Sequence, residues 1–205
     1  METRERILNK AHELFMLYGI RSVSMDEIAA HLGISKKTIY QFFADKDALV
    51  DGVIDIEMTN NTCDCEANKE KSDNAIHEIY LGDACVDDLL KVMNPSMIYD
   101  LEKYHNKSYS KINQYKNKFL FEFVKGNLER GIAEGLYRDD INVEVISRFR
   151  LAAVFLLFNT DQFPHGKYTL PQILTEISDN FLHGIASAKG LKLIQKYKQQ
   201  ISVKQ

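Results

Sequence analysis

The sequence predicts an all-α protein, with a small three-helix domain in residues 1–48 and a larger C-terminal helical bundle in residues 49–205. Apolar residues recur at the spacing of amphipathic helices along most of the chain, and no alternating strand pattern of useful length is present. The three prolines lie late in the chain, at Pro95, Pro164 and Pro171, where they are typical of helix boundaries.

The composition favours a folded chain without a membrane span. The 205 residues are 45% hydrophobic and 27% charged, which argues against disorder. The longest purely apolar run covers residues 151–158, whereas a helix that crosses a bilayer needs about twenty residues. The first predicted helix carries Glu2, Glu5 and Glu13, and a signal peptide would not contain these acidic residues. We therefore expect a cytoplasmic protein with no membrane partner.

Charge is distributed unevenly along the chain. The net charge is 0 in residues 1–50, −8 in residues 51–188 and +5 in residues 189–205. The acidic middle is a poor surface for nucleic acid, so any such binding has to use a local patch elsewhere. The basic end is predicted to be an amphipathic, solvated terminal helix.

Three short helices and their end signals are predicted in residues 3–50. Gly19 ends the first helix, and Ser24 with Glu27 forms a capping box at the start of the second. Gly33 ends the second helix, and Ser35 caps the third. The residues expected to face inward are Ile7, Ala11, Leu14, Phe15 and Tyr18 on the first helix, Ile28, Ala29 and Leu32 on the second, and Ile39, Phe42 and Phe43 on the third.

The connection between the second and third helices contains only Gly33, Ile34 and Ser35. So short a turn makes the two helix axes cross steeply, as in a helix-turn-helix. Ala29 is small enough for a close crossing, and Gly33 can adopt a positive φ at the corner. The alternative is an ordinary helical corner within a bundle.

The remaining positions of the third helix then face outward. Lys36, Lys37, Tyr40 and Gln41 form a short basic and hydrogen-bonding face, which suits contacts with phosphates and base edges. The cationic residues that could flank this face are Arg4, Arg6, Arg21 and Lys46.

The stretch from Arg4 to Val50 resembles the DNA-binding domain of TetR-family transcriptional regulators. The resemblance rests on Gly-Ile-Ser-Lys-x-Thr-Ile-Tyr-x-x-Phe-x-x-Lys, which begins at Gly33, and it covers about a quarter of the chain. It departs from the family at Gln41-Phe42, where many members carry Tyr or His before the Phe. The DNA-binding residues that we predict from the outward face and from the resemblance are Ser24, Ser35, Lys36, Lys37, Thr38, Tyr40, Gln41 and Lys46.

The resemblance also implies a homodimer that binds a palindromic double-stranded DNA operator and releases it when an unknown small-molecule inducer binds the C-terminal domain. Repression follows from the habit of the family alone. No cofactor and no enzymatic activity are expected, because the sequence lacks a Gly-rich phosphate loop, His-Glu-x-x-His and Gly-x-Ser-x-Gly. The rival hypothesis is a helical sensor or scaffold whose corner binds protein.

In the C-terminal part we expect helices near residues 46–60, 74–94, 96–104, 108–134, 142–161 and 170–188. The polar stretch 59–72 is predicted to be a helix end and a loop. Residues 146–158 are apolar almost all round, so this helix has to be buried on two sides. Its own domain can bury one side, and we expect a partner subunit to bury the other. The interface residues predicted for this dimer are Phe149, Phe155, Leu156, Ile177 and Phe181.

The site of an inducer is predicted only from aromatic composition. Ligand sites in helical bundles are often lined by aromatic side chains, although ordinary core is the commoner role for each residue. The candidates are Tyr80, Tyr99, Tyr104, Phe119, Phe123 and Phe155. Cys63, Cys65 and Cys85 are expected to be free thiols, because the Cys-x-Cys spacing is too short for a zinc knuckle and no metal is expected.

Overall fold

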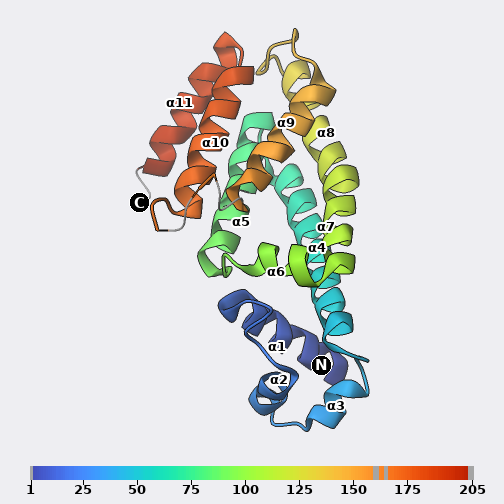
Figure 1. Ribbon diagram of the computed structural model, residues 1–205. Helices are drawn as coiled ribbons and strands as arrows, with labels where there is room; N and C mark the ends of the chain where they lie inside the picture. The colour runs from blue at the N-terminus through green and yellow to red at the C-terminus, as the bar shows by residue number, and fades with distance from the viewer. Residues whose placement is uncertain (1, 159–161, 164–165, 203–205) are drawn as a thin grey trace. The chain divides into compact units, whose positions relative to one another are not determined.

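The computed structural model describes residues 2–158, 162–163 and 166–202, and the regular secondary structure of this part of the chain is helical apart from one isolated β-bridge between Tyr137 and Ala186 (Figure 1). The chain forms two compact units. Unit 1 comprises residues 1–62 and 90–115, and unit 2 comprises residues 63–89 and 116–205. The boundary expected after residue 48 falls within a continuous helix, α4, and differs from this division.

Unit 1 contains the three predicted N-terminal helices and a second layer of helices from later in the chain. Its helices are α1 (Thr3–Tyr18), α2 (Met25–Leu32), α3 (Lys36–Tyr40), the first part of α4 (Lys46–Lys71), α6 (Met97–Tyr104) and α7 (Asn106–Tyr115). Its fully buried side chains include Ile7, Phe15, Ile20, Ile28, Ile39, Leu49 and Leu101. The small helices are therefore held together by one apolar core, which also receives a side chain of α6.

The helix ends in residues 19–35 have the predicted geometry. Gly19 has φ +82° and Gly33 has φ +65°, so both lie in the left-handed region that glycine adopts without a steric penalty. Ser24 and Glu27 form the capping box, in which the Ser24 hydroxyl accepts from the Glu27 N–H at 3.2 Å and the Ser24 N–H donates to the Glu27 carboxylate at 2.6 Å. The Ser35 hydroxyl accepts from the Thr38 N–H at 3.1 Å.

Polar contacts attach α6 and α7 to the rest of unit 1. The Asp100 carboxylate of α6 accepts from the backbone N–H of Arg21 at 3.1 Å, and the N–H of Asn94 donates to the carbonyl of Met16 at 2.6 Å. A row of acidic side chains on α4 faces α7 and the residue before it. This row is made of Asp47 with His105, Asp51 with Lys107 and Ser108, and Asp55 with Lys111.

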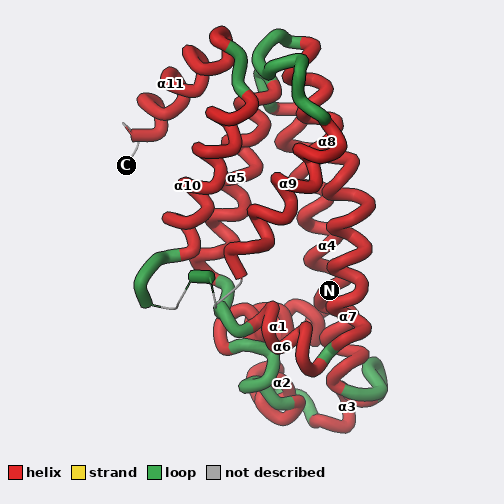
Figure 2. The backbone as a smooth tube through the Cα atoms, turned by 45° about the horizontal axis from the view of Figure 1, so that its top comes forward, coloured by secondary structure: helices red, strands yellow, loops and turns green. Residues whose placement is uncertain are grey.

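Unit 2 is a helical bundle that also includes the second part of α4. Its helices are α5 (Ala75–Val92, of which residues 75–89 belong here), a π-helical turn (Lys116–Leu120), α8 (Phe121–Ala133), α9 (Val143–Phe155), a 3₁₀ turn (Leu156–Phe158), α10 (Leu170–Ile185) and α11 (Ala188–Ser202). Figures 1 and 2 show α8 beside α9. The buried cluster of this unit includes Ile76, Leu128, Phe181, Leu182 and Ile194.

The prediction of a helix end and loop in residues 59–72 is wrong, because α4 continues to Lys71. The hydroxyls of Thr59 and Thr62 donate back to the carbonyls of Asp55 and Met58, both at 2.8 Å, so these polar residues are accommodated within the helix.

Three other helices differ from their predicted form. The helix expected at 108–134 begins at Asn106 and is interrupted by the π-helical turn, which shifts its side-chain register. The end of the helix expected at 142–161 lies partly outside the described residues, and the α-helical part stops at Phe155. The terminal helix is docked rather than fully solvated, because Ile194 is buried in the core of unit 2.

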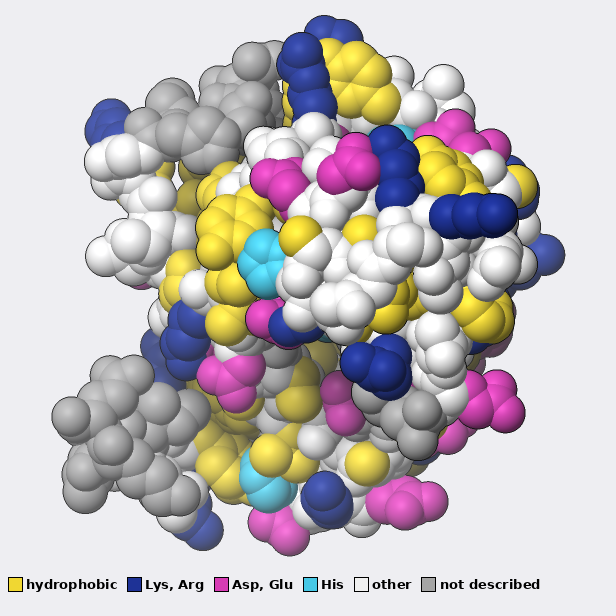
Figure 3. Space-filling view, turned by 90° about the horizontal axis from the view of Figure 1, so that it is seen from below, with side chains coloured by type: hydrophobic (Ala, Val, Ile, Leu, Met, Phe, Trp, Pro, Cys, Tyr) yellow, Lys and Arg dark blue, Asp and Glu magenta, His cyan; other side chains and the backbone are white. Residues whose placement is uncertain are grey.

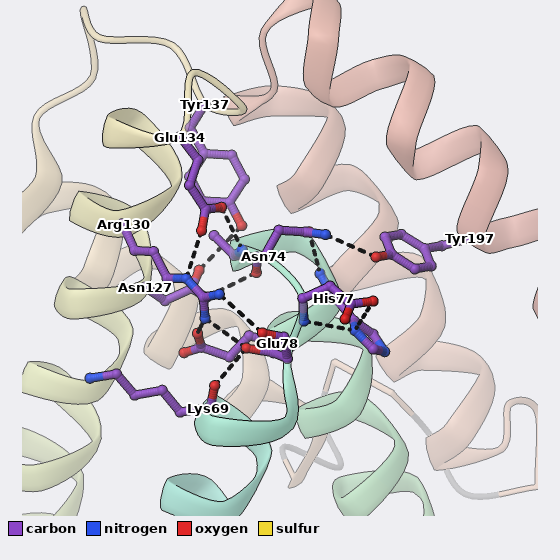
Figure 4. Close-up of polar contacts among 12 residues, drawn as sticks. Lys69, Asn74, His77, Glu78, Asn127, Arg130, Glu134, Tyr137 and Tyr197 are labelled. Carbon is purple, nitrogen blue, oxygen red and sulfur yellow. Dashed lines mark hydrogen bonds and ion pairs between the residues drawn. The ribbon is translucent and has the colours of Figure 1, made fainter.

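A polar network in unit 2 joins the end of α4, the start of α5 and the end of α8 (Figure 4). The Arg130 guanidinium donates to the Glu78 carboxylate at 2.9 Å, to the Glu134 carboxylate at 2.7 Å and to the Ser72 hydroxyl at 2.6 Å. Glu78 is 3% exposed, so Arg130 neutralises a carboxylate that water hardly reaches. Within the part of the chain that is described, no helix is long and apolar enough to cross a membrane.

Candidate nucleic-acid interface

The third helix presents opposite faces to the core and to solvent, as predicted. Ile39 is fully buried and Phe43 is nearly so, whereas Lys37, Tyr40 and Gln41 are exposed. Figure 3, which views the molecule from below, shows basic, acidic and hydrophobic side chains intermingled on the side that it presents. The burial of one side of α3 fixes the direction in which its polar side points.

The two lysines of α3 differ in their surroundings. The Lys36 ammonium donates to the Asp26 carboxylate of α2 at 2.7 Å, and this hydrogen bond raises the pKa of Lys36. The Lys37 side chain forms no hydrogen bond or ion pair within the described ranges of the chain. The Lys37 ammonium is therefore available for a phosphate without breaking an existing contact, whereas Lys36 has to leave Asp26 first.

The serine and threonine hydroxyls among the predicted site residues form hydrogen bonds at the starts of α2 and α3. Ser24 is engaged in the capping box of α2, and the Ser35 and Thr38 hydroxyls lie 2.9 Å apart at the start of α3. These contacts hold the first turns of both helices in place. The structure therefore gives Ser24, Ser35 and Thr38 a structural role beside the predicted contact with DNA.

Lys46 lies at the start of α4, but its side chain is directed into unit 1. The Lys46 ammonium donates to the carbonyls of Ile20 and Val23, at 2.6 and 2.5 Å, and lies 5.8 Å from the centre of the Phe15 ring. Burial lowers the pKa of Lys46, although the negative charges of Asp100 and other carboxylates act to raise it. Lys46 thus connects α4 to the loop between α1 and α2, and the geometry offers no support for a phosphate contact.

Replacing Lys46 by methionine distinguishes these two roles. We expect the free energy of unfolding to fall by about 1–3 kcal/mol, because two backbone carbonyls lose a charged donor. The salt dependence of DNA binding should be unchanged. Lys37→Met is the matched control, and it should instead lower the slope of log affinity against log salt by about 0.9 for each phosphate that the lysine neutralises. A lower salt slope for Lys46→Met would assign Lys46 to the DNA.

The prediction that Phe42 faces inward is wrong. Helical periodicity places it facing inward, yet 42% of its surface is exposed, next to Tyr40 with 44% exposed. The reason is that α3 ends at Tyr40, so helical periodicity no longer predicts the direction of the next side chains. The early end of the helix adds an aromatic side chain to the outward face.

The three flanking arginines are exposed, and two of them contact aromatic rings. The Arg4 guanidinium lies 5.3 Å from the centre of the Phe43 ring, and that of Arg21 lies 5.4 Å from the Tyr104 ring. Arg6 projects from α1. These contacts orient Arg4 and Arg21 while leaving their charge at the surface.

The aromatic residues predicted to line an inducer site do not form one group. Tyr99 and Tyr104 belong to α6 in unit 1, are 52% and 42% exposed, and both contact the Lys103 ammonium. Tyr80, Phe119, Phe123 and Phe155 belong to unit 2 and are half-buried, with Phe119 stacked on Phe123 at a centroid distance of 6.2 Å. The surface position of Tyr99 and Tyr104 argues against a pocket role for them.

The predicted dimer residues also differ in exposure. Phe149 and Leu156 are exposed on α9 and the following turn, Phe155 and Ile177 are half-buried, and Phe181 is 4% exposed. Because Phe181 packs in the core of its own chain, it has little surface left for a partner. Val145 and Ala152, which sequence reasoning missed, are exposed at helical spacing from Phe149 and complete an apolar stripe.

Comparison with known proteins agrees with this geometry. Residues 7–53 match the family model described as bacterial regulatory proteins, tetR family. The HTH-type transcriptional regulator SAB2452 of Staphylococcus aureus is 33% identical over 129 residues, which are 60% of this chain and 65% of that protein. The HTH-type transcriptional repressor KstR2 of Rhodococcus jostii is 25% identical, with 90% of this chain and 91% of that protein covered.

Solved structures share the fold over most of the chain. The ketosteroid transcriptional regulator KstR2 of Mycobacterium tuberculosis has a TM-score of 0.63 at 20% identity, covering 91% of this chain and 96% of that one. A transcriptional regulator of Cytophaga hutchinsonii has a TM-score of 0.71 at 19% identity, covering 89% and 98%.

The helix-turn-helix of unit 1, with the polar side of α3 exposed, defines a DNA-binding regulator of transcription. Residues 7–53 match the tetR family model, and the named relatives are transcriptional regulators, so the helix-turn-helix of this chain is similar to that of TetR-family regulators.

Proposed function

We propose that this regulator is a homodimeric repressor that binds a palindromic operator through α3 and is released by a small molecule bound in unit 2. The observation that carries the DNA contact is the exposure of Lys37 and Tyr40 on α3, and of Gln41 directly after it, while Ile39 packs the other side of the helix into the core. Lys37 supplies charge for a phosphate, Tyr40 can contact a thymine methyl or a phosphate, and Gln41 can pair with adenine.

A dimer is required to read two half-sites. The apolar stripe of α9, composed of Val145, Phe149, Ala152 and Leu156, supports an interface in which the same patch of two copies meets. The two α3 helices would then lie about 34–36 Å apart, in successive major grooves on one side of the duplex.

The dimer is tested by replacing Phe149 with glutamate. Its ring is 59% exposed in the single chain, so the substitution should leave the fold intact while placing a charge in the interface. We expect the mass in solution, measured by light scattering, to fall from dimer to monomer at micromolar concentration. Arg148→Glu, at the neighbouring exposed position of α9, is the control. A Phe149→Glu protein that remains dimeric would remove this stripe from the interface.

Ligand control is supported by the way in which the helix-turn-helix is held. The loop between α1 and α2 is bound by Lys46 of α4 and by Asp100 of α6, and α4 is one continuous helix as far as Lys71. A ligand that binds unit 2 better when α4 is tilted would weaken DNA binding, and DNA would weaken ligand binding by the same factor. The repressor name of a relative supports repression over activation.

The experiment for the DNA function is selection of duplex sequences by the purified protein, followed by affinity measurements at several salt concentrations. We expect a palindromic sequence and an affinity that falls steeply with salt, because phosphate contacts release counterions. If no sequence is enriched and the protein is not retained on duplex DNA at low salt, the result favours the rival hypothesis, in which the helical corner binds protein.

A further inference from the structure

A buried polar cluster in unit 2 joins three helices and has no part in the DNA interface. Arg150 of α9 is 6% exposed, although it lies in the stretch that the sequence predicts to be apolar almost all round. Its Nη2 donates to Asp83 of α5 at 2.7 Å and to the Ser178 hydroxyl of α10 at 2.9 Å. Burying an ion pair between helices costs desolvation free energy, which is offset only if the remaining N–H donors of the guanidinium also form hydrogen bonds.

One side of the Arg150 guanidinium is not satisfied. Its Nη1 is buried and has no hydrogen-bond partner among the residues that the structure describes. The ring of Phe181 lies 5.0 Å from the guanidinium carbon and so leaves no polar partner in that direction. Buried unpaired donors are uncommon, because each forfeits its hydrogen bonds with water.

A second unpaired group lies on the same face of α5. Tyr80 precedes Asp83 by three positions, about one helical turn, and its hydroxyl is buried with no hydrogen-bond partner in the described parts of the chain. Burial raises the pKa of Tyr80 to about 12, and the charges of Asp179 and Asp83 act in the same direction. The hydroxyl therefore keeps its proton near neutral pH and can donate it.

The charges around the two groups select the kind of acceptor that fits. Arg150 is already neutralised by Asp83, so a carboxylate or phosphate placed at Nη1 would bring a second negative charge close to Asp83. A cationic group would be repelled by the positive charge of the Arg150 guanidinium. A neutral carbonyl oxygen has two lone pairs and can accept from both donors without adding charge.

We propose that Arg150 Nη1 and the Tyr80 hydroxyl bind the carbonyl oxygen of a neutral, mainly apolar small molecule, such as a ketone. This inference rests on the proposed ligand-responsive function and specifies the chemical class of its ligand. The carbonyl supplies the hydrogen bonds that the folded chain alone leaves unmade.

The test uses the full-length protein and three neutral ketones: acetophenone, cyclohexanone and 2-nonanone. Binding is followed by the ¹³C shift of the labelled carbonyl, which moves downfield when the oxygen accepts hydrogen bonds. We expect at least one ketone to bind with this shift. Ethylbenzene and benzoate, an apolar and an anionic analogue of acetophenone, should bind at least about tenfold more weakly than the ketone that binds best.

Tyr80→Phe is the decisive variant, since it removes only the hydroxyl. The free energy of unfolding should be unchanged or higher, because a buried group without a partner is removed. Affinity for the ketone should fall about tenfold, and the carbonyl shift should shrink. The matched control is Tyr99→Phe, whose hydroxyl is at the surface of α6 and accepts from Lys103 at 2.7 Å. Arg150→Met should abolish the shift, and Tyr80→Phe supplies the answer if Arg150→Met fails to fold.

Absence of binding by all three ketones, or equal affinities of Tyr80→Phe and wild type, would overturn the proposal and leave ordered water as the partner of both groups. Binding to the selected operator is measured on the same samples. If the operator binds and the ketones do not, the ligand class is wrong. If the ketones bind and no operator is found, the DNA function proposed above is wrong.

Discussion

Replacing Arg130 by methionine is expected to lower the free energy of unfolding by about 3–5 kcal/mol, the typical cost of breaking a buried ion pair. Glu78 would lose the charge that compensates its buried carboxylate, and Ser72 would lose its donor (Figure 4). The measurement is denaturant unfolding followed by circular dichroism, at one fixed protein concentration because association contributes to stability.

The control for this prediction lies on the same helix. Lys125 pairs with Glu129 at 3.9 Å, and both side chains are exposed, so Lys125→Met should cost less than about 1 kcal/mol. Adding Glu78→Gln to Arg130→Met should restore part of the stability, because the uncompensated charge is then removed as well. A decrease for Arg130→Met no larger than that for Lys125→Met would show that the network contributes little to stability.

Replacing Lys37 and Tyr40 together by alanine is expected to lower operator affinity by at least about 100-fold while leaving the dimer folded. Each side chain is exposed in the free protein, so its removal should not disturb the core. Gel shift measures the affinity, and circular dichroism with light scattering reports the fold and the dimer.

A matched double variant is available on α6 of the same unit. Lys103 and Tyr99 are also an exposed lysine and tyrosine, and Lys103→Ala with Tyr99→Ala should leave operator affinity within about threefold of wild type. Unchanged affinity of the Lys37→Ala, Tyr40→Ala protein would refute the assignment of α3 as the helix that contacts DNA.

The N-terminal helices could be predicted because their signals are local. Ser24 caps a residue three positions away, and Gly33 ends its helix through its own backbone angle. The direction of Phe42 could not be predicted, since it depends on where α3 stops. The role of Lys46 depends on the carbonyls of Ile20 and Val23, which the fold alone brings to it.

Beyond residue 50 the sequence is a weaker guide to the structure, because the continuation of α4 and contacts between residues far apart in the chain decide it. Polar residues near Thr59 and Thr62 indicated a loop, but back-bonding to the preceding turn keeps them helical. Arg150 interrupts an apolar run, and its partner Asp83 lies 67 positions earlier in the chain. The sequence shows that a charged residue is present there. It does not show that the Arg150 side chain is buried, or that its Nη2 has hydrogen-bond partners while its Nη1 has none among the described residues.

Two copies of α3 that read successive major grooves should leave a characteristic pattern in hydroxyl-radical footprinting and methylation interference on the selected operator. We expect two protected half-sites whose centres are about 10–10.5 base pairs apart, with guanine N7 interference inside both. A single uninterrupted protected stretch, or protection without major-groove interference, would contradict this expectation.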